Sequence, residues 1–280
     1  MAGLFGPVAA HAADQHVFWE VAGRHNTVYL MGSVHVLKKT DAALPVVAEA
    51  AYLDAETVIQ EIDPFAAAAE MGGVAALALQ ALPEGQSLAA VLGPELHARL
   101  QKDSALLQIN TDSLARKQPW YVALLVLQAR LAQGGFSSAD GVDYQIALRA
   151  RRDSKPLRGL ETTVEQLAVF ARMPMEDQRE FLRGMLDEVD MARDLEEITA
   201  AWRRGDLAML ESLLRSGVAE SPAFFQALTT ERNLRWLPQI EAMLADPEDD
   251  YLVVTGALHM VGDEGLVELL RRKGYRVDRR

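Results

Sequence analysis

The stretch YLVVTGALH, residues 251–259, decides the fold class of this chain. Its first five residues form an apolar run, rich in β-branched side chains, of the kind found in strands that are buried on both faces. Gly256 ends the run, and His259 follows three residues later. The same order occurs near the other end of the chain, where VYLM precedes Gly32 and His35. The sequence thus repeats one strand-Gly-x-x-His arrangement.

Other segments of strand character lie at both ends of the chain. Gly23–Asn26 separates the first two and predicts a β-hairpin. The predicted strands are Val17–Ala22, Thr27–Met31, Thr57–Ile62, Pro156–Gly159, Tyr251–Thr255 and Tyr275–Asp278. A sheet assembled from both ends argues for one domain with helical insertions, not two domains in series. We therefore predict an α/β fold: a helix-rich single domain with a mixed central sheet and a long helical insertion.

The helical insertion runs from roughly residue 64 to residue 250, interrupted by the strand near 156–159. The predicted helices cover residues 41–55, 65–82, 94–107, 119–132, 142–152 and 262–273. The stretch from 162 to 244 is expected to be almost wholly helical. Its breaks are expected near 173–174, 205 and 221–222, where Pro or Gly occurs.

The composition excludes several classes of protein. The 280-residue chain is half hydrophobic and carries a formal net charge of −12, so a nucleic-acid partner is not expected. It has no cysteine, which excludes disulfides, zinc fingers and iron–sulfur sites. No apolar run approaches the roughly 20 residues of a membrane span. Any metal site must therefore use histidine, carboxylate and water.

Residues 1–13, MAGLFGPVAAHAA, have features of an export signal. Ala10-His11-Ala12 has the small-x-small form of a signal-peptidase site. The apolar stretch before it is short and follows no Lys or Arg, so we interpret residues 1–13 as a truncated signal peptide that precedes a domain at 14–280. This interpretation predicts a periplasmic or secreted protein; without a signal the protein would be cytoplasmic.

Four polar side chains are predicted to meet at one edge of the sheet. His35, His259, Glu61 and Glu161 each lie at or just after the end of a predicted strand. If these strands are parallel neighbours, all four lie at the carboxyl edge, where open α/β sheets bind ligands. Two imidazoles and one or two carboxylates can hold a divalent cation, which makes a water acidic enough to attack a carbonyl.

Each of these residues also has a structural interpretation. A single Gly-x-x-His is of little value, and His35 alone would more often be a structural histidine. Two copies, each after a strand, shift the balance toward function. Glu61 alone could be a partly exposed carboxylate at a strand end, and Glu161 alone could be an acid that favours a helix N-terminus.

Two further clusters could contribute to the site. Asp143 opens a helix and is either a first-turn acid or a site carboxylate. Arg232 and Asn233 could polarise a substrate carbonyl or orient a site carboxylate. Taken alone, that pair is more typical of a salt-bridged helix surface.

Several of these motifs, in this order, resemble the TraB/GumN family. They are residues 18–21 with 27–35, 58–63, 159–162 with 165–166, 231–233, and 253–259 followed by 262–275. The resemblance extends from about Val17 to the C-terminus. The family is related to Tiki proteins, which are metal-dependent proteases, and more distantly to erythromycin esterase-like hydrolases.

The resemblance implies a metal-dependent hydrolase, most simply a peptidase that acts on a peptide or protein. Carried over by motif, the site residues would be His35, His259 and Glu61, with Glu161, Arg232 and Asn233 as supporting residues. We expect His35, His259 and Glu161 to hold the metal, with Glu61 as the base; the two glutamates could also exchange roles. Arg232 and Asn233 would stabilise the oxyanion, and Asp143 matches a supporting Gly-x-Asp element. The metals implied are Mn²⁺ or Co²⁺, with Zn²⁺ as an alternative. Two other functions stay open: a peptide-sequestering protein without turnover, and a metal-independent esterase-like hydrolase.

Overall fold

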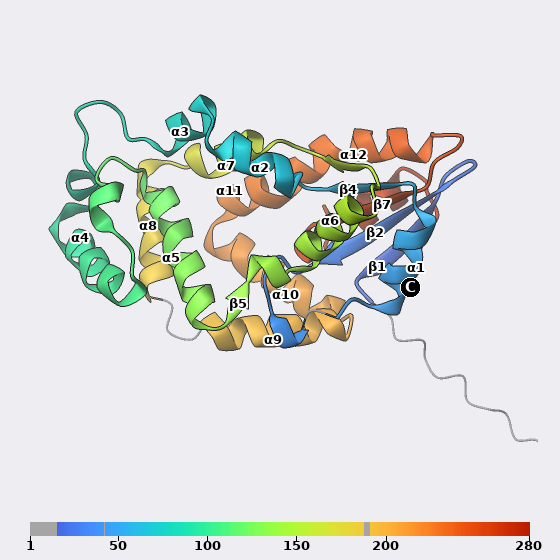
Figure 1. Ribbon diagram of the computed structural model, residues 1–280, viewed down its shortest axis with the longest axis horizontal. Coiled ribbons are helices and arrows are strands. Elements are labelled where there is room, and N and C mark those ends of the chain that lie inside the picture. Colours follow the sequence, from blue (N-terminus) through green and yellow to red (C-terminus); the bar gives the residue numbers. More distant parts are fainter. Residues whose placement is uncertain (1–15, 42, 188–190) are drawn as a thin grey trace, which may run out of the picture.

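The computed structural model describes residues 16–41, 43–187 and 191–280, and a mixed six-stranded sheet lies at its centre. The order across the sheet is β6-β4-β7-β2-β1-β8 (Figure 1). The strands are β1 (Phe18–Ala22), β2 (Thr27–Ser33), β4 (Thr57–Gln60), β6 (Leu157–Gly159), β7 (Tyr251–Gly256) and β8 (Val277–Arg279). The proposed export signal, residues 1–13, lies outside the described residues.

The apolar run at 251–255 forms the central strand. β7 pairs in parallel with β2 on one side and with β4 on the other, so that Val253 lies opposite both Leu30 and Ile59. All six residues of β7 are buried. β6 extends the parallel part beyond β4, whereas β1 and β8 are antiparallel. The predicted mixed sheet, built from both ends of the chain with one strand from the middle, is confirmed.

Helices make up most of the rest of the described chain. They are α1 (Val46–Asp54), α2 (Pro64–Met71), α3 (Val74–Gln80), α4 (Leu88–Leu107), α5 (Pro119–Gln133), α6 (Val142–Arg152), α7 (Thr163–Ala171), α8 (Met175–Asp187), α9 (Met191–Arg203), α10 (Leu207–Glu220), α11 (Pro222–Phe225), α12 (Glu231–Leu244) and α13 (Leu266–Arg272). Short 3₁₀ turns lie at Lys39–Asp41, Thr111–Leu114, Ser138–Asp140 and Ala257–His259, and a π-helical turn, η4, spans Gln226–Thr230. The predicted helix breaks between 162 and 244 are confirmed.

Several predicted helices differ from those observed. Helix α1 begins at Val46 and not at residue 41, and α13 begins at Leu266 and not at residue 262. The segment predicted as one helix at 65–82 is two, α2 and α3, because the chain turns at Gly72-Gly73. Helix α4 begins at Leu88, ahead of the predicted start at Pro94, and is kinked at Gly93, whose φ of 73° is accessible to glycine at little cost. A small second ladder, β3 (Leu37–Lys38) with β5 (Phe136–Ser137), was not predicted, since two-residue strands have no readable periodicity.

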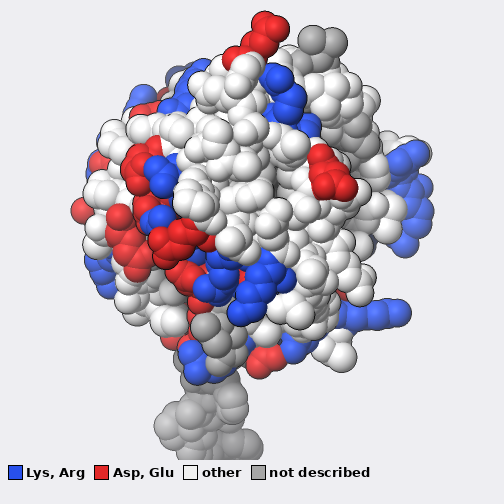
Figure 2. Space-filling view, turned by 90° about the vertical axis from the view of Figure 1, so that its left-hand side faces the viewer, with Lys and Arg blue, Asp and Glu red and all other residues white. Residues whose placement is uncertain are grey.

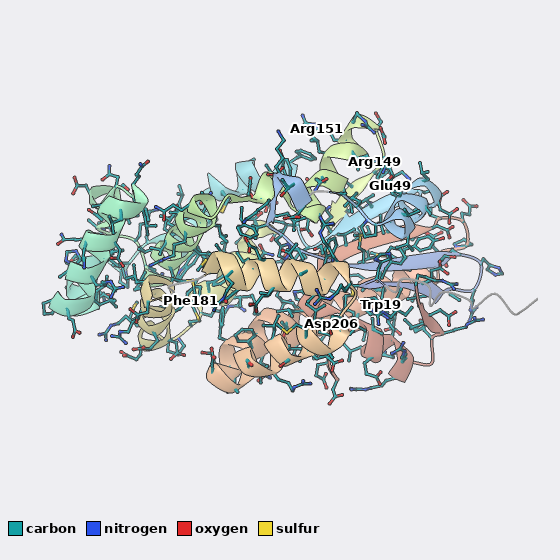
Figure 3. The ribbon with its side chains drawn as sticks, turned by 90° about the horizontal axis from the view of Figure 1, so that it is seen from below. Trp19, Glu49, Arg149, Arg151, Phe181 and Asp206 are labelled. Atoms are coloured by element: carbon teal, nitrogen blue, oxygen red, sulfur yellow. The ribbon has the colours of Figure 1, made fainter. Side chains whose placement is uncertain are left out.

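The hydrophobic core has a sheet part, a helical part and a smaller cluster around Trp120 and Leu167. The sheet part gathers β-strand side chains with those of α1, α6, α12 and α13. The helical part lies among α4, α5 and α8, around Leu100, Val122 and Leu182; Figure 1 shows these helices at the end away from the sheet. Figure 3 shows Glu49 of α1 beside Arg149 of α6, which form an ion pair at the sheet end.

The surface mixes charges of both signs. On the end of the molecule that carries α4 and α8, Figure 2 shows acidic and basic side chains interspersed. On α8, for example, Arg179 pairs with Glu176 and Arg183 with Glu180. None of the helices in the described part of the chain has the length and apolar character needed to cross a membrane.

Candidate functional site

The carboxyl ends of four parallel strands bring the predicted site residues together. His35 follows β2, Glu61 follows β4, His259 follows β7, and Glu161 follows β6. Because β2, β7, β4 and β6 are consecutive parallel neighbours, all four side chains lie at one edge of the sheet. The predicted convergence is therefore confirmed, whereas the roles of the individual residues stay predictions.

His35 is held by the first turn of α6. Its Nδ1 lies 2.9 Å from Oδ2 of Asp143, and Oδ1 of the same carboxylate accepts a hydrogen bond from Ser33 at 2.5 Å. Asp143 raises the pKa of His35 to about 9, even though the desolvation of the ring opposes this. Over half of the side-chain surface of His35 is exposed, at 57%. Asp143 therefore orients an accessible imidazole, whose Nε2 faces the sheet edge.

His259 is buried and oriented by Asn233 of α12. The amide nitrogen of Asn233 donates to the carbonyls of His259 and Glu264, so its oxygen is the atom that faces Nδ1 of His259, at 2.7 Å. Nδ1 must then carry the proton, and Nε2 has the free lone pair. Burial lowers the pKa of His259 to about 3, which keeps the ring neutral. Trp236 packs beside the ring, with centroids 4.6 Å apart.

Glu61 lies between the two histidines. Its Oε1 is 3.6 Å from Nε2 of His35 and 3.7 Å from Nε2 of His259. The same oxygen accepts a hydrogen bond from the backbone N–H of Gly256 at 2.7 Å. Burial alone would raise the pKa of Glu61, but Arg232, the two histidines and this N–H together hold it well below its usual value. Glu61 is therefore ionised where both Nε2 atoms converge.

Arg232 joins the two glutamates. Its Nη2 donates to Glu61 at 2.5 Å and to Glu161 at 2.6 Å, and its Nε donates to Glu161 at 2.9 Å. Its Nη1 lies 3.0 Å from Nε2 of His259. Burial would lower the pKa of Arg232, but the two carboxylates raise it above its ordinary value. Arg232 is thus a buried cation that is shared by two buried carboxylates.

The structure corrects one sequence-based interpretation and adds a residue. Arg232 and Asn233 are only 3% and 1% exposed, so they do not form the salt-bridged helix surface that their pattern alone favoured. Gln166 of α7, to which no role was assigned, donates to Glu61 at 3.2 Å and to Glu161 at 3.5 Å. It lies in the first turns of α7, whose N-terminus directly follows Glu161 and is fixed by a capping box between Thr162 and Glu165.

Both glycines of the repeated motif are required by close approach. A Cβ on Gly256 would lie 2.8 Å from Nε2 of His35 and 3.3 Å from Oε1 of Glu61. A Cβ on Gly32 would lie 2.4 Å from the side chain of Val17 and 3.0 Å from the backbone of Ala257. The glycines therefore make room for the site and for the sheet packing beneath it.

The donor set suits a divalent cation, although it is not gathered as a finished cage. Each imidazole has Nδ1 fixed by an oxygen and directs Nε2 toward Glu61, which is the usual support for a metal-binding histidine. Among the described residues, however, no group of three His, Asp or Glu side chains is close enough to hold a metal ion. The contact between Arg232 and Nε2 of His259 occupies one of the donor atoms.

Comparison with known proteins places this arrangement in a family. A sequence model of the TraB/PrgY/gumN family matches residues 17–279. The chain belongs to this family. As a TraB/PrgY/gumN protein it is similar to the uncharacterized protein YbaP of Shigella flexneri, with 27% identity over 89% of this chain and 88% of the relative. YbaP of Escherichia coli strain K12 is 26% identical over 87% of each chain.

One relative of lower identity is named as an enzyme, a metalloprotease. Metalloprotease TIKI1 of Danio rerio is 23% identical over 95% of this chain and 63% of the relative. This TraB/PrgY/gumN chain thus spans about two thirds of the length of TIKI1. No solved structure matches the chain.

Proposed function

We propose that this protein is a metal-dependent hydrolase that cleaves a peptide bond. The observation that carries the proposal is the convergence of Nε2 of His35 and Nε2 of His259 on one oxygen of Glu61, at 3.6 and 3.7 Å. Each ring is turned by a hydrogen bond to its other nitrogen, which is the arrangement expected of metal ligands. The similarity to TIKI1, which is named as a metalloprotease, supports the same reaction class.

The contacts favour a division of roles between the glutamates. Glu61 lies between both imidazoles, so we propose His35, His259 and Glu61 as the residues that hold the cation. Glu161 was the sequence-based choice of third ligand, but its carboxylate is engaged by Arg232 and Arg235. We assign Glu161 the task of positioning Arg232. Mn²⁺ and Co²⁺ are the first metals to test, followed by Zn²⁺.

When bound, a divalent cation polarises a carbonyl and lowers the pKa of a water. The other steps depend on side chains of the protein. Glu61 is ionised, and its Oε1, the oxygen that Arg232 does not hold, faces both histidines and would contact the cation. Arg232 is a buried cation beside the site and can balance negative charge that develops on a substrate oxygen. The amide of Asn233 is engaged by the ring and carbonyl of His259 and by the carbonyl of Glu264, so its role is positioning.

The experiment measures metal content and cleavage together. The protein is purified without chelator, its metal content is determined by mass spectrometry, and a peptide library is incubated with Mn²⁺, Co²⁺ or Zn²⁺. We expect bound metal, cleavage that stops with EDTA, and loss of both in His259→Ala. His25→Ala, at an exposed residue of the hairpin turn, is the control. Retention of metal in His259→Ala would show that the ligand assignment is wrong.

A second function has an observation in its favour. The guanidinium of Arg232 forms ion pairs with both Glu61 and Glu161, so the chain itself supplies a partner for these carboxylates in a site that binds peptide without turnover. The same experiment separates the two functions. A protein that captures peptides, binds no metal and cleaves nothing would be a sequestering protein and not a hydrolase.

A further inference from the structure

A large apolar cavity opens directly from the candidate site. It has a volume of about 660 Å³, and one wall is formed by His35, Glu61, Arg232 and His259. The other walls come from helices in the insertion between the sheet strands, including α5, α7, α9, α10 and η4. Their side chains include Leu124, Phe170, Ile198, Leu213, Phe225 and Leu228. The volume lies within the range of roughly 300–1,000 Å³ that is usual for ligand pockets.

The chemistry of these walls selects what they can hold. Among the described residues that line the cavity away from the site, the polar side chains are Ser33, Gln166 and Thr229. A charged group placed deep in this cavity would be desolvated without a partner, which is unfavourable. A large aliphatic or aromatic group would instead exchange water for apolar contact. The cavity therefore favours apolar groups more bulky than one methyl.

A second cavity meets the first at the site. It has a volume of about 310 Å³ and is lined by Ser138, Asp143 and Tyr144, among others. His35, Glu61 and Gln166 belong to the lining of both cavities. A chain that crosses these three residues would have one flank in each cavity. The site is thus a junction, with an apolar side and a smaller side that carries a carboxylate.

We propose that the substrate is a peptide with consecutive large apolar side chains on one side of the cleaved bond, which occupy the 660 Å³ cavity. This inference rests on the proposed hydrolase function for its chemistry, but its binding part stands on the cavity alone. Ile198 of α9 and Leu228 of η4 are then specificity-determining residues: Ile198 supplies apolar contact, and Leu228 limits the volume.

The test measures binding separately from cleavage. Eight-residue fluorescent peptides carry a Leu-Phe, Ala-Ala or Ser-Ser pair at successive positions, and their affinities are measured by fluorescence anisotropy in the presence of EDTA. We expect the best Leu-Phe peptide to bind at least about tenfold more tightly than its Ser-Ser counterpart, because burial of each large side chain is favourable. Equal affinity for the two peptides would overturn the inference.

Two variants locate the binding in the cavity. Ile198→Asp should weaken Leu-Phe binding by at least about tenfold and change Ser-Ser binding little. Leu228→Trp keeps the wall apolar but fills space, so it should weaken Leu-Phe binding more than Ala-Ala binding. Val218→Asp, at an exposed position of α10 outside the cavity lining, is the matched control. Circular dichroism melts confirm that each variant is folded. Unchanged Leu-Phe selectivity in both folded cavity variants would overturn the inference.

The outcomes also separate this inference from the proposed function. Selective binding of Leu-Phe peptides without cleavage under any metal would support the cavity assignment and overturn the hydrolase. Metal-dependent cleavage with no preference for apolar pairs would support the hydrolase and overturn the cavity assignment.

Discussion

Nη1 of Arg232 lies 3.0 Å from Nε2 of His259, the ring nitrogen that has no proton. This contact places a permanent cation at the donor atom that a metal would use. A divalent ion at His259 must therefore displace the guanidinium from that nitrogen, while Glu61 and Glu161 continue to hold it from the other side. Arg232 and a metal ion would thus compete for Nε2 of His259, whereas both would offset the negative charge of Glu61.

Replacement of Arg232 tests this relationship. In Arg232→Ala two buried carboxylates lose their shared cation, so the free energy of unfolding of the metal-free protein should fall by about 3–5 kcal/mol. Added Mn²⁺ should restore part of the loss, since a cation near Glu61 replaces the missing charge. The measurement is urea denaturation with EDTA and with Mn²⁺. The control is Arg235→Ala, whose half-exposed guanidinium lies 3.5 Å from Glu161 and should cost less than about 1 kcal/mol.

The tautomer of His259 depends on Asn233. In Asn233→Ala the Nδ1 proton loses its acceptor and the backbone carbonyls of His259 and Glu264 lose a donor, so stability should fall by about 1–3 kcal/mol. Nitrogen NMR of the histidine rings should show a single tautomer in the wild type and a mixture in the variant. Gln239→Ala, which removes a hydrogen bond from the same helix to Leu160, should leave the tautomer unchanged.

A methyl group on Gly256 should damage the site more than the fold. Its Cβ would lie 2.8 Å from Nε2 of His35, an exposed side chain that can move away. Gly256→Ala should therefore keep a melting temperature close to that of the wild type but bind metal more weakly, by tenfold or more. Gly184→Ala, in the middle of α8 with open space at its Cβ, is the matched control. Wild-type metal affinity in Gly256→Ala would contradict the arrangement of His35 described here.

Tyr251 should make stability fall at alkaline pH. Its burial and its hydrogen bond to Asp246 raise its pKa to about 12, above the ordinary value of 10.0. The folded state thus holds the phenolic proton more tightly, and the stabilisation is complete below pH 10 and is lost as the pH rises toward 12. Urea denaturation between pH 8 and 12 should show that loss. The curve for Tyr251→Phe should be flatter above pH 10 and parallel to the wild type below pH 9.

The sheet edge could be predicted from the sequence because its signals are local. The apolar run at 251–255 identifies a doubly buried strand, and Gly256 and His259 follow at fixed spacing. Once the strands are parallel, the positions of His35, Glu61 and Glu161 follow from geometry. The sequence signals that identify this edge lie within a few residues of each strand end.

The surroundings of the edge could not be predicted in the same way. The sequence of α12 shows which residues share a face, but only tertiary packing decides that Arg232 and Asn233 are covered. The backbone N–H of Gly256 has no sequence signature as a donor to Glu61. Nothing in the sequence of α7 singles out Gln166 from its polar neighbours Thr163 and Glu165 as a contact of Glu61. The kink of α4 depends on a positive φ at Gly93. A glycine permits this conformation, but its presence alone does not predict it.

The position of β7 has a consequence for folding during synthesis on the ribosome. This strand lies between β2 and β4, yet it is made after most of the helices. Until residues 251–256 have emerged, the strand that pairs with both β2 and β4 is missing. His259 is then also missing from its place beside His35 and Glu61. Folding must wait for this long-range pairing, which is intrinsically slow. The nascent chain therefore stays without its complete site, and any activity of that site begins only after nearly all of the protein has been synthesised.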